Sequence, residues 1–351
     1  MKIIFKRTTP TYRNQLTTQQ VMLYLTATLV VVSLFSVGYY FTLGADYGIK
    51  ALLMIIASVV AAYLCEAGYF YLLKEKDIKK AVNNSFPYVT AILFALILPI
   101  GTPYYVVIFG SIFSILIGKL LFGGFGQNIF NPALIGRVFV MMSYGDKLTA
   151  VLPGKAVDGV ASATPTTIMS MGSWMGDSNI SLANLYLGFY KGSIGETFAL
   201  IIIIAGVFLA MKKVLDWRLP VFYIGTAFVI AFIAGMTHGL SPLHFALLHI
   251  GIGGLVFGGI FMLTDPVTSP VDPFGKILFA VGAAFFTMLL RFRSNMPEGV
   301  LYSILIMNML TPMIDKYTII PTNKNESRKL IIVIAAMLIC SLLIALVWKG
   351  A

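Results

Sequence analysis

Apolar residues form long runs along this chain, and polar residues gather in the shorter segments between them. A helix that crosses a lipid bilayer needs roughly 17–25 mostly apolar residues, and most of the runs reach this length. The candidate spans are residues 21–42, 50–73, 86–99, 104–121, 128–142, 195–211, 219–236, 242–263, 275–291, 298–314 and 329–348.

This pattern predicts an all-α polytopic membrane protein with about ten or eleven transmembrane helices. The runs at 86–99 and 128–142 are short, which is typical of half-helices or re-entrant segments surrounded by protein or water. Residues 87–121 fit either one broken span or two. Composition agrees, because 58% of the 351 residues are hydrophobic and 11% are charged, against about 25% charged in soluble domains.

In a soluble chain, the net charge of +11 would indicate nucleic-acid binding. Here we expect the excess Lys and Arg to lie in cytoplasmic loops, where they set the orientation in the membrane, and we expect no nucleic-acid partner. Residues 1–20 are polar and basic, without the features of a cleavable signal peptide. If the N-terminus is cytoplasmic, most Lys and Arg fall in cytoplasmic segments, with Lys119 among them. Arg291 then falls outside, as does the long loop 143–194.

Two proline-flanked segments, 99–103 and 266–270, each precede an apolar run. Five spans separate the equivalent elements, and an odd number inverts the second copy. We therefore expect a first membrane repeat over 1–142, an extracytoplasmic loop over 143–194, and a second, inverted repeat with a C-terminal helix over 195–351. Folds of this kind place their sites near the midplane, beside interrupted helices.

The long loop carries a candidate attachment site for a cofactor. Asp158, Ala163 and Thr164 match the acceptor signature Asp-x-x-Ser/Thr-Gly-Ala-Thr, in which a Thr hydroxyl is joined to FMN by a phosphoester. Ala161 and Ser162 depart from it. Thr164 keeps the acceptor hydroxyl, and small neighbours leave room for delivery of the phosphate. A flexible polar loop is the alternative.

A glycine-rich stretch, Gly-Gly-Phe-Gly-Gln-Asn-Ile-Phe-Asn-Pro-Ala over residues 123–133, precedes a short apolar run containing Arg137. Glycines such as Gly124 allow unusual φ values and close backbone approach. Gln127, Asn128 and Asn131 are costly at membrane depth unless they are paired. The stretch is either part of a binding site or a cytoplasmic turn with a helix cap.

A third stretch, Thr-Asp-Pro-Val-Thr-Ser-Pro, runs from Thr264 through Asp265 and Thr268 to Pro270. Asp265 either caps the next helix or contacts an ion or cofactor at a broken helix. Glu66 lies within a candidate span, where an acid is costly and often functional. It is a candidate for an ion pathway, together with Asp265, or a partner of Arg137 or a nearby polar group.

The cysteines and histidines do not indicate a metal or catalytic site. Cys65 and Cys340 lie inside apolar runs without metal-ligand spacing, so neither a disulfide framework nor a metal site is expected. His238, His244 and His249 are interpreted as core or hydrogen-bonded residues.

The three stretches, in this order, resemble the RnfD subunit of the Rnf electron-transport complex and its relative, the NqrB subunit of the sodium-pumping NADH:quinone reductase. The resemblance covers nearly the whole chain and implies a fold similar to urea and ammonium channels, in a prokaryotic cell (inner or plasma) membrane. It implies electron transfer through FMN held covalently by Thr164 in an outward-facing loop. It also implies a second flavin, riboflavin, held non-covalently near residues 123–131 and 264–270.

The resemblance further implies an assembly that oxidises reduced ferredoxin, reduces NAD⁺ and moves Na⁺ or H⁺ outward. The partners would be the other Rnf subunits (A, B, C, E and G), and a flavin transferase would attach the FMN. Neither a Rossmann fingerprint nor a cysteine cluster for iron–sulfur ligation occurs here, so ferredoxin and NAD⁺ would be bound by partner subunits. The alternatives are the quinone-reducing homologue and a urea- or ammonium-type channel.

Overall fold

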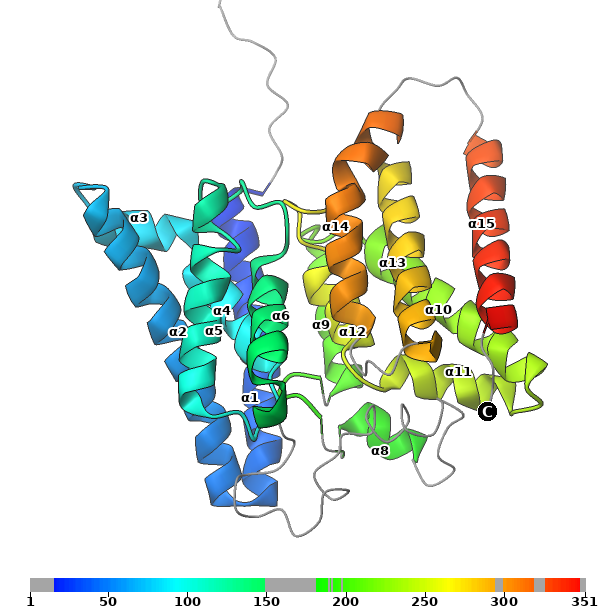
Figure 1. Ribbon diagram of the computed structural model, residues 1–351, viewed down its shortest axis with the longest axis horizontal. Coiled ribbons are helices and arrows are strands. Elements are labelled where there is room, and N and C mark those ends of the chain that lie inside the picture. The colour runs from blue at the N-terminus through cyan, green and yellow to red at the C-terminus, as the bar shows by residue number, and fades with distance from the viewer. Residues whose placement is uncertain are drawn as a thin grey trace, which may run out of the picture.

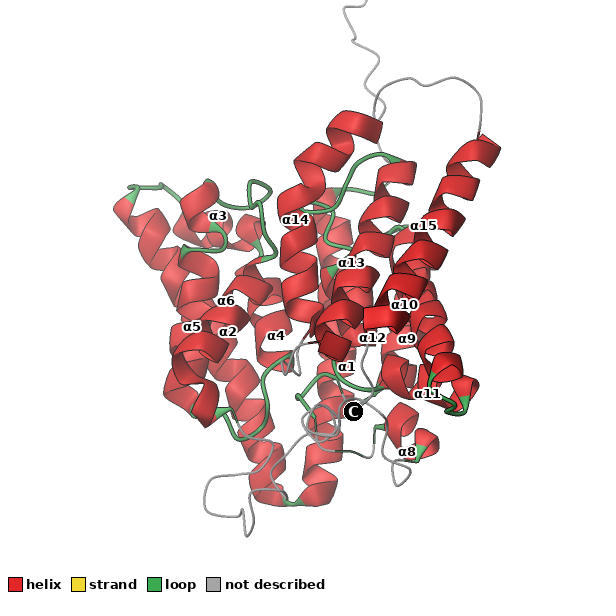
Figure 2. Ribbon diagram, turned by 45° about the vertical axis from the view of Figure 1, so that its right-hand side comes forward, coloured by secondary structure: helices red, strands yellow, loops and turns green. Residues whose placement is uncertain are grey.

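The computed structural model of this chain describes residues 16–148, 181–188, 190, 192–196, 198–293, 299–318 and 326–347. These residues are almost entirely helical (Figure 2). Within them, β-structure amounts to one isolated antiparallel bridge between Pro99 and Ser193.

The helices fall into a first and a second half of the chain. The first half contains α1 (Thr18–Leu43), α2 (Ala45–Leu72), α3 (Ile78–Ser85), α4 (Pro87–Leu96), α5 (Tyr104–Leu116), η1 (Leu120–Phe122), α6 (Pro132–Tyr144) and η2 (Gly145–Lys147). After α8 (Leu182–Leu187), the second half contains α9 (Ala199–Met211), α10 (Arg218–Thr237), α11 (Pro242–Gly251), α12 (Leu255–Phe257), the π-helical η4 (Gly258–Met262), α13 (Pro273–Arg293), α14 (Gly299–Thr318) and α15 (Glu326–Val347).

Within the described residues, five helical segments are long and apolar enough to cross a bilayer: α1, α2, Tyr104–Phe122, α10 and α13. A sixth results if α11 and the Leu255–Met262 segment, bent by 67° relative to each other, form one span. The prediction of an all-helical polytopic membrane protein is confirmed at this level. The total of ten or eleven spans stays a prediction, because it also counts shorter apolar helices such as α4 and α9.

Local sequence explains where several helices begin. Thr17 and Gln20 form a capping box at the start of α1, each side chain accepting a hydrogen bond from the other residue's backbone N–H. Pro87, Pro132 and Pro242 stand at the first positions of α4, α6 and α11, where the missing N–H costs nothing. The short runs at 86–99 and 128–142 therefore become short helices, and α4 and α5 are separate helices.

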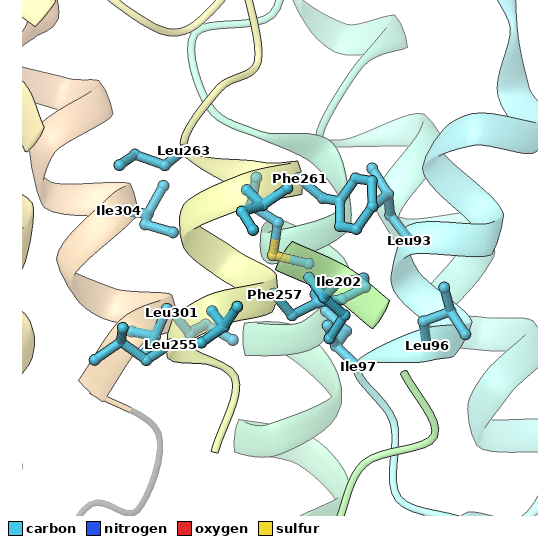
Figure 3. Packing of buried hydrophobic residues seen from close by; sticks show 14 of the residues in the cluster. Leu93, Leu96, Ile97, Ile202, Leu255, Phe257, Phe261, Leu263, Leu301 and Ile304 are labelled. Atoms are coloured by element: carbon cyan, nitrogen blue, oxygen red, sulfur yellow. The ribbon is translucent and has the colours of Figure 1, made fainter. Parts of the chain in front are cut away.

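The two halves lie side by side, with α1 to α6 on one side of the bundle and α9 to α15 on the other (Figure 1). They meet where α1 contacts α9 and α6 contacts α14. The core between them is apolar. Leu93 and Leu96 of α4 face Ile202 of α9 and Phe261 of η4, while Ile304 of α14 covers the far side of η4 (Figure 3).

Each half contains an interrupted helix, and the two interruptions lie toward opposite ends of the bundle (Figure 1). Between α3 and α4, Phe86 has left-handed backbone angles (φ 53°, ψ 50°). Between α11 and α12, Gly253 has a φ of 66°. Carbonyls at the end of a helix need partners outside it. At the end of α4, the carbonyls of Leu96 and Leu98 accept hydrogen bonds from Gly195 and Ile194.

Candidate functional site

The glycine-rich stretch reverses the chain between η1 and α6. Gly123, Gly124 and Gly126 have φ values of 112°, 95° and 85°, so the expectation of unusual backbone angles is confirmed. Side chains other than glycine rarely adopt these angles. At Gly124 and Gly126 an added Cβ would have nothing within 4 Å, so the turn requires glycine there for its φ values and not for space.

The two asparagines of this stretch are paired, as burial requires. Asn131 caps α6, because its Oδ1 accepts a hydrogen bond from the Ala133 N–H at 3.0 Å. Its Nδ2 donates a second bond, to the Met262 carbonyl at 3.3 Å. Asn128 donates to the Phe130 carbonyl at 3.1 Å and also to the Asp265 carboxylate. Both bonds that reach the second half end at or just after η4, so the glycine-rich stretch closes against the second interrupted helix.

Asp265 organises the loop between η4 and α13. It accepts hydrogen bonds from the Val267 N–H at 3.2 Å and from Thr268 Oγ1 at 3.3 Å. Burial raises the pKa of its carboxyl, and the hydrogen bonds from Val267, Thr268 and Asn128 counteract part of this rise. The interpretation of Asp265 as the cap of the next helix is wrong, because Asp272 caps α13 through the N–H groups of Phe274 and Gly275.

A cavity of about 790 Å³, including its open mouth, lies where these segments meet. One wall is aromatic and aliphatic, with Phe86, Phe125 and Phe261 among its side chains. The polar groups on the walls come from Thr90, Lys119, Asn128, Asn131, Thr264 and Asp265. A mostly apolar cavity with a few convergent polar groups is typical of a ligand or cofactor site.

A buried ion pair stands behind this cavity. Glu66 in α2 and Lys119, which follows α5, are 2.6 Å apart, with side-chain exposures of 0% and 3%. Lys119 also donates to the Ser85 carbonyl, the last of α3. Glu66 therefore pairs with a nearby polar group other than Arg137. The Lys119 side chain is enclosed by α2, α3 and the cavity, and its assignment to a cytoplasmic segment stays a prediction.

Residues 6–324 match the sequence profile of the NQR2, RnfD, RnfE family. The chain belongs to this family.

Relatives in the family carry two kinds of name. The D subunit of the proton-translocating ferredoxin:NAD(+) oxidoreductase complex of Clostridium ljungdahlii is 38% identical over 284 residues, which cover 78% of this chain and 84% of the relative. The D subunit of the Na(+)-translocating ferredoxin:NAD(+) oxidoreductase complex of Acetobacterium woodii is 36% identical over 277 residues, covering 78% and 83%. The B subunit of the Na(+)-translocating NADH-quinone reductase of Ectopseudomonas mendocina is 33% identical over 268 residues, covering 74% and 66%. The family resemblance predicted from the three motifs is confirmed.

A second buried cation lies at the end of α11. Arg291 of α13, 1% exposed, donates hydrogen bonds to the carbonyls of His249 and Ile252 at the end of α11. Lys119 likewise donates a hydrogen bond to the last carbonyl of α3. The bundle buries Arg291, and its assignment to the extracytoplasmic side stays a prediction. His249 lies in the core, as expected, between Phe245 and Phe292, whereas His244 is exposed.

The structure brings together part of the predicted site. Asn128, Asn131, Thr264 and Asp265 line the cavity, and Thr268 lies behind Asp265. Gly124 and Gln127 do not line it, and Gln127 is exposed. The predicted attachment residues Asp158, Ser162, Ala163 and Thr164 lie outside the described residues.

Sequence reasoning missed Lys119, Phe86 and Phe125 as parts of the site. One signal was available for Lys119, because an acid inside a span, Glu66, needs a buried partner. For the two aromatic residues no local signal exists, since phenylalanines are frequent throughout the chain.

Proposed function

We propose that this chain is the membrane subunit of an Rnf-type complex, which transfers electrons between reduced ferredoxin and NAD⁺ and couples this transfer to outward movement of Na⁺ or H⁺. Support comes from relatives 38% and 36% identical, which are named as parts of ferredoxin:NAD(+) oxidoreductase complexes that translocate protons or Na⁺. Ferredoxin and NAD⁺ would bind partner proteins, for which the other Rnf subunits are the candidates. A role in an NADH:quinone reductase is the alternative within the family.

The observation that carries the redox proposal is the cavity between the two interrupted helices. Its aromatic wall suits a flat ring system, and the Asn128, Asn131 and Thr264 side chains supply hydrogen-bonding groups at its polar side. The residues present therefore fit a flavin ring, such as that of riboflavin. When bound, a flavin supplies one-electron chemistry, while this chain binds the ring, orients it and sets its electrostatic surroundings.

A second, covalent flavin is proposed on Thr164, whose hydroxyl would be joined to FMN by a separate flavin transferase. Intact mass of the chain, expressed with the transferase, tests this proposal. The wild type should carry the mass of one FMN minus water, and Thr164→Ala should lose it. An unmodified wild type would favour the channel alternative, since a channel has no use for an acceptor threonine. A modified variant would move the anchor to Thr166 or Thr167.

The cavity is tested separately, through flavin that is released when the protein is precipitated. In the purified complex, Asn128→Leu should remove one equivalent of released flavin and leave the covalent flavin unchanged. Gln127→Leu is the matched control, because this neighbouring amide is exposed and does not line the cavity. Wild-type flavin content in Asn128→Leu would remove the cavity from consideration.

The inverted repeat is part of the same proposal. The order of α1 to α6 parallels that of α9 to α14, with α3 and α4 corresponding to α11 and the α12–η4 segment. Support comes from the equivalent cations, since Lys119 and Arg291 each bind carbonyls at an interruption. The interruptions lie toward opposite ends of the bundle, as inversion requires (Figure 1). On this basis we infer membrane repeats over 1–142 and 195–351, with an extracytoplasmic loop over 143–194.

Orientation follows from the exposed charges. Lys74, Lys76, Lys79 and Lys80 are exposed at the end of the bundle where α1 begins. Basic residues of this kind concentrate on the cytoplasmic side. We therefore infer a cytoplasmic N-terminus and an outward-facing flavin loop, in a prokaryotic cell membrane.

Glu66 and Asp265 are the proposed groups of an ion pathway. Both are acids near interrupted helices, where transporters place coupling-ion sites. Glu66→Gln and Asp265→Asn, made separately in the complex, should lower ion transport per electron transferred. Ion transport that stays at the wild-type ratio in both variants would remove these residues from the pathway.

A further inference from the structure

Lys119 is a buried ammonium with unused hydrogen-bonding capacity. An ammonium has three N–H donors. Glu66 Oε1 accepts one at 2.6 Å and the Ser85 carbonyl accepts another. Within the described part of the chain, the third donor has no acceptor. Burial of a charged group is costly unless its donors are satisfied, so a third partner is expected at this position.

The direction in which that partner lies is set by the surroundings of the ammonium. Glu66 and Ser85 approach from α2 and α3, away from the cavity, and neither lines it. Lys119 itself lines the cavity, and its Nζ is 5.7 Å from the centre of the Phe125 ring, which lines it as well. The free donor is thus available on the cavity side.

The backbone holds this side chain in place. The Lys119 carbonyl accepts a hydrogen bond from the Gly124 N–H at 3.1 Å, which ties the residue to the glycine-rich turn. Gly118, just before it, packs so closely that an added Cβ would lie 2.8 Å from Pro132 Cα. A preorganised donor of this kind loses little conformational entropy when a ligand binds.

We propose that the Lys119 ammonium is the charged donor that this cavity presents to the electron-rich edge of a bound flavin ring, its carbonyl oxygens and ring nitrogens. The inference rests on the proposed function, in which the cavity holds a non-covalent flavin. Each electron that the ring accepts adds one negative charge, unless a proton from water follows it. A fixed positive charge beside the ring favours this added charge, so Lys119 raises the midpoint potential of the flavin.

Lys119→Met tests the proposal, because methionine keeps the length of the side chain and removes its charge. The readouts are the content of released flavin in the purified complex and the midpoint potential of the equivalent that Asn128→Leu removes. We expect the ratio of reduced to oxidised flavin at a fixed potential to fall at least tenfold, which is 59 mV for a one-electron couple, or the flavin to be lost. Covalent flavin should be unchanged, as an internal reference.

Two further variants make the result decisive. Lys79→Met on α3 is the control, since this lysine is exposed and outside the cavity. The double variant Lys119→Met with Glu66→Gln removes both buried charges, so it should fold even if the single variant does not. It should lower the potential in the same direction, by less than the single variant because no unpaired Glu66 carboxylate remains, or lose the flavin.

Two outcomes would overturn the inference, and they differ in what else they overturn. If the variants that lack the ammonium keep wild-type flavin content and potential, Lys119 has no part in a cavity that still holds flavin. If the wild-type complex has no flavin equivalent that depends on Asn128, the cavity assignment itself fails, and the inference fails with it.

Discussion

Asn131 and Met262, from opposite halves of the chain, are joined by a hydrogen bond of 3.3 Å from the asparagine Nδ2 to the methionine carbonyl. The same asparagine caps α6 through its Oδ1. One side chain therefore starts a helix in the first half and satisfies a carbonyl at the end of η4 in the second. The position of the cavity depends on this link, because its two polar segments flank these residues.

Replacement of Asn131 should destabilise the protein in two separable steps. Asn131→Ser keeps a capping oxygen but cannot reach Met262, whose carbonyl then keeps only the bond from the Asp265 N–H at 3.4 Å. Loss of the one hydrogen bond should cost about 0.5–1.5 kcal/mol. Asn131→Ala also removes the cap, for about 1 kcal/mol more. Thermal unfolding in detergent measures both, with the exposed Asn83→Ala as the control. Wild-type stability in Asn131→Ala would show that neither bond matters.

Gly136 in α6 permits close packing against α5, and Gly136→Ala should disturb it. The added Cβ would lie 2.7 Å from Ser114 Cβ and 2.9 Å from the Gly110 carbonyl. Overpacking of this kind costs about 1–3 kcal/mol. Gly68→Ala in α2 is the matched control, because nothing lies within 4 Å of its added Cβ. Alanine there should leave stability unchanged or raise it by up to about 1 kcal/mol.

If both glycine variants unfolded at the same temperature in detergent, the close approach of α5 and α6 would be contradicted.

The Glu66–Lys119 pair should show strong energetic coupling. Removing one partner leaves the other charge buried, which typically costs about 3–5 kcal/mol. Removing both, in Glu66→Gln with Lys119→Met, should cost much less than the sum of the two single changes. Unfolding of the four proteins in denaturant gives the coupling energy. Additive effects would mean that the two charges do not interact in the folded protein.

Asp216 should stabilise the protein in a pH-dependent way. It pairs with Arg218 at 3.2 Å and with Lys276 at 3.0 Å, which ties the loop before α10 to α13. Burial works to raise the pKa of Asp216, but the hydrogen bonds from Lys276 and Arg218 outweigh it, and the pKa is lowered from 3.8. A lowered pKa means that the stabilisation is present above the ordinary aspartate pKa and is lost as pH falls below it.

Asp216→Asn should therefore cost up to about 1 kcal/mol at pH 7, since both pairs are partly exposed. Near pH 3 and below, the variant and the wild type should approach the same stability. Melting temperatures measured across this range in detergent would reveal the convergence. A constant difference at all pH values would assign the effect to packing.

Sequence alone determined most of the long helices and the family, although the run at 242–263, expected as one span, is bent by 67° between α11 and the Leu255–Met262 segment. The run at 104–121 corresponds to the Tyr104–Phe122 segment, and the run at 219–236 to α10. Both could be predicted because a continuous run of apolar residues is a local property of the sequence, and a helix that is apolar all round is buried in lipid or in the protein core. The short run at 86–99 became α4 for an equally local reason, since Pro87 fixes where a helix can start. The motifs around Asn131 and Asp265 sufficed for family assignment.

Tertiary structure alone decided which polar groups meet. Glu66 finds Lys119 across α2 and α5, and Lys119 is buried although it follows the apolar run like a loop residue. Asp265 accepts hydrogen bonds from its own loop and from the Asn128 amide. Asp272 caps α13, although the sequence suggested Asp265 as the cap. The reason is physical. A helix forms from interactions within a few residues, whereas the partner of a buried charge depends on how separate helices pack, which no local pattern encodes.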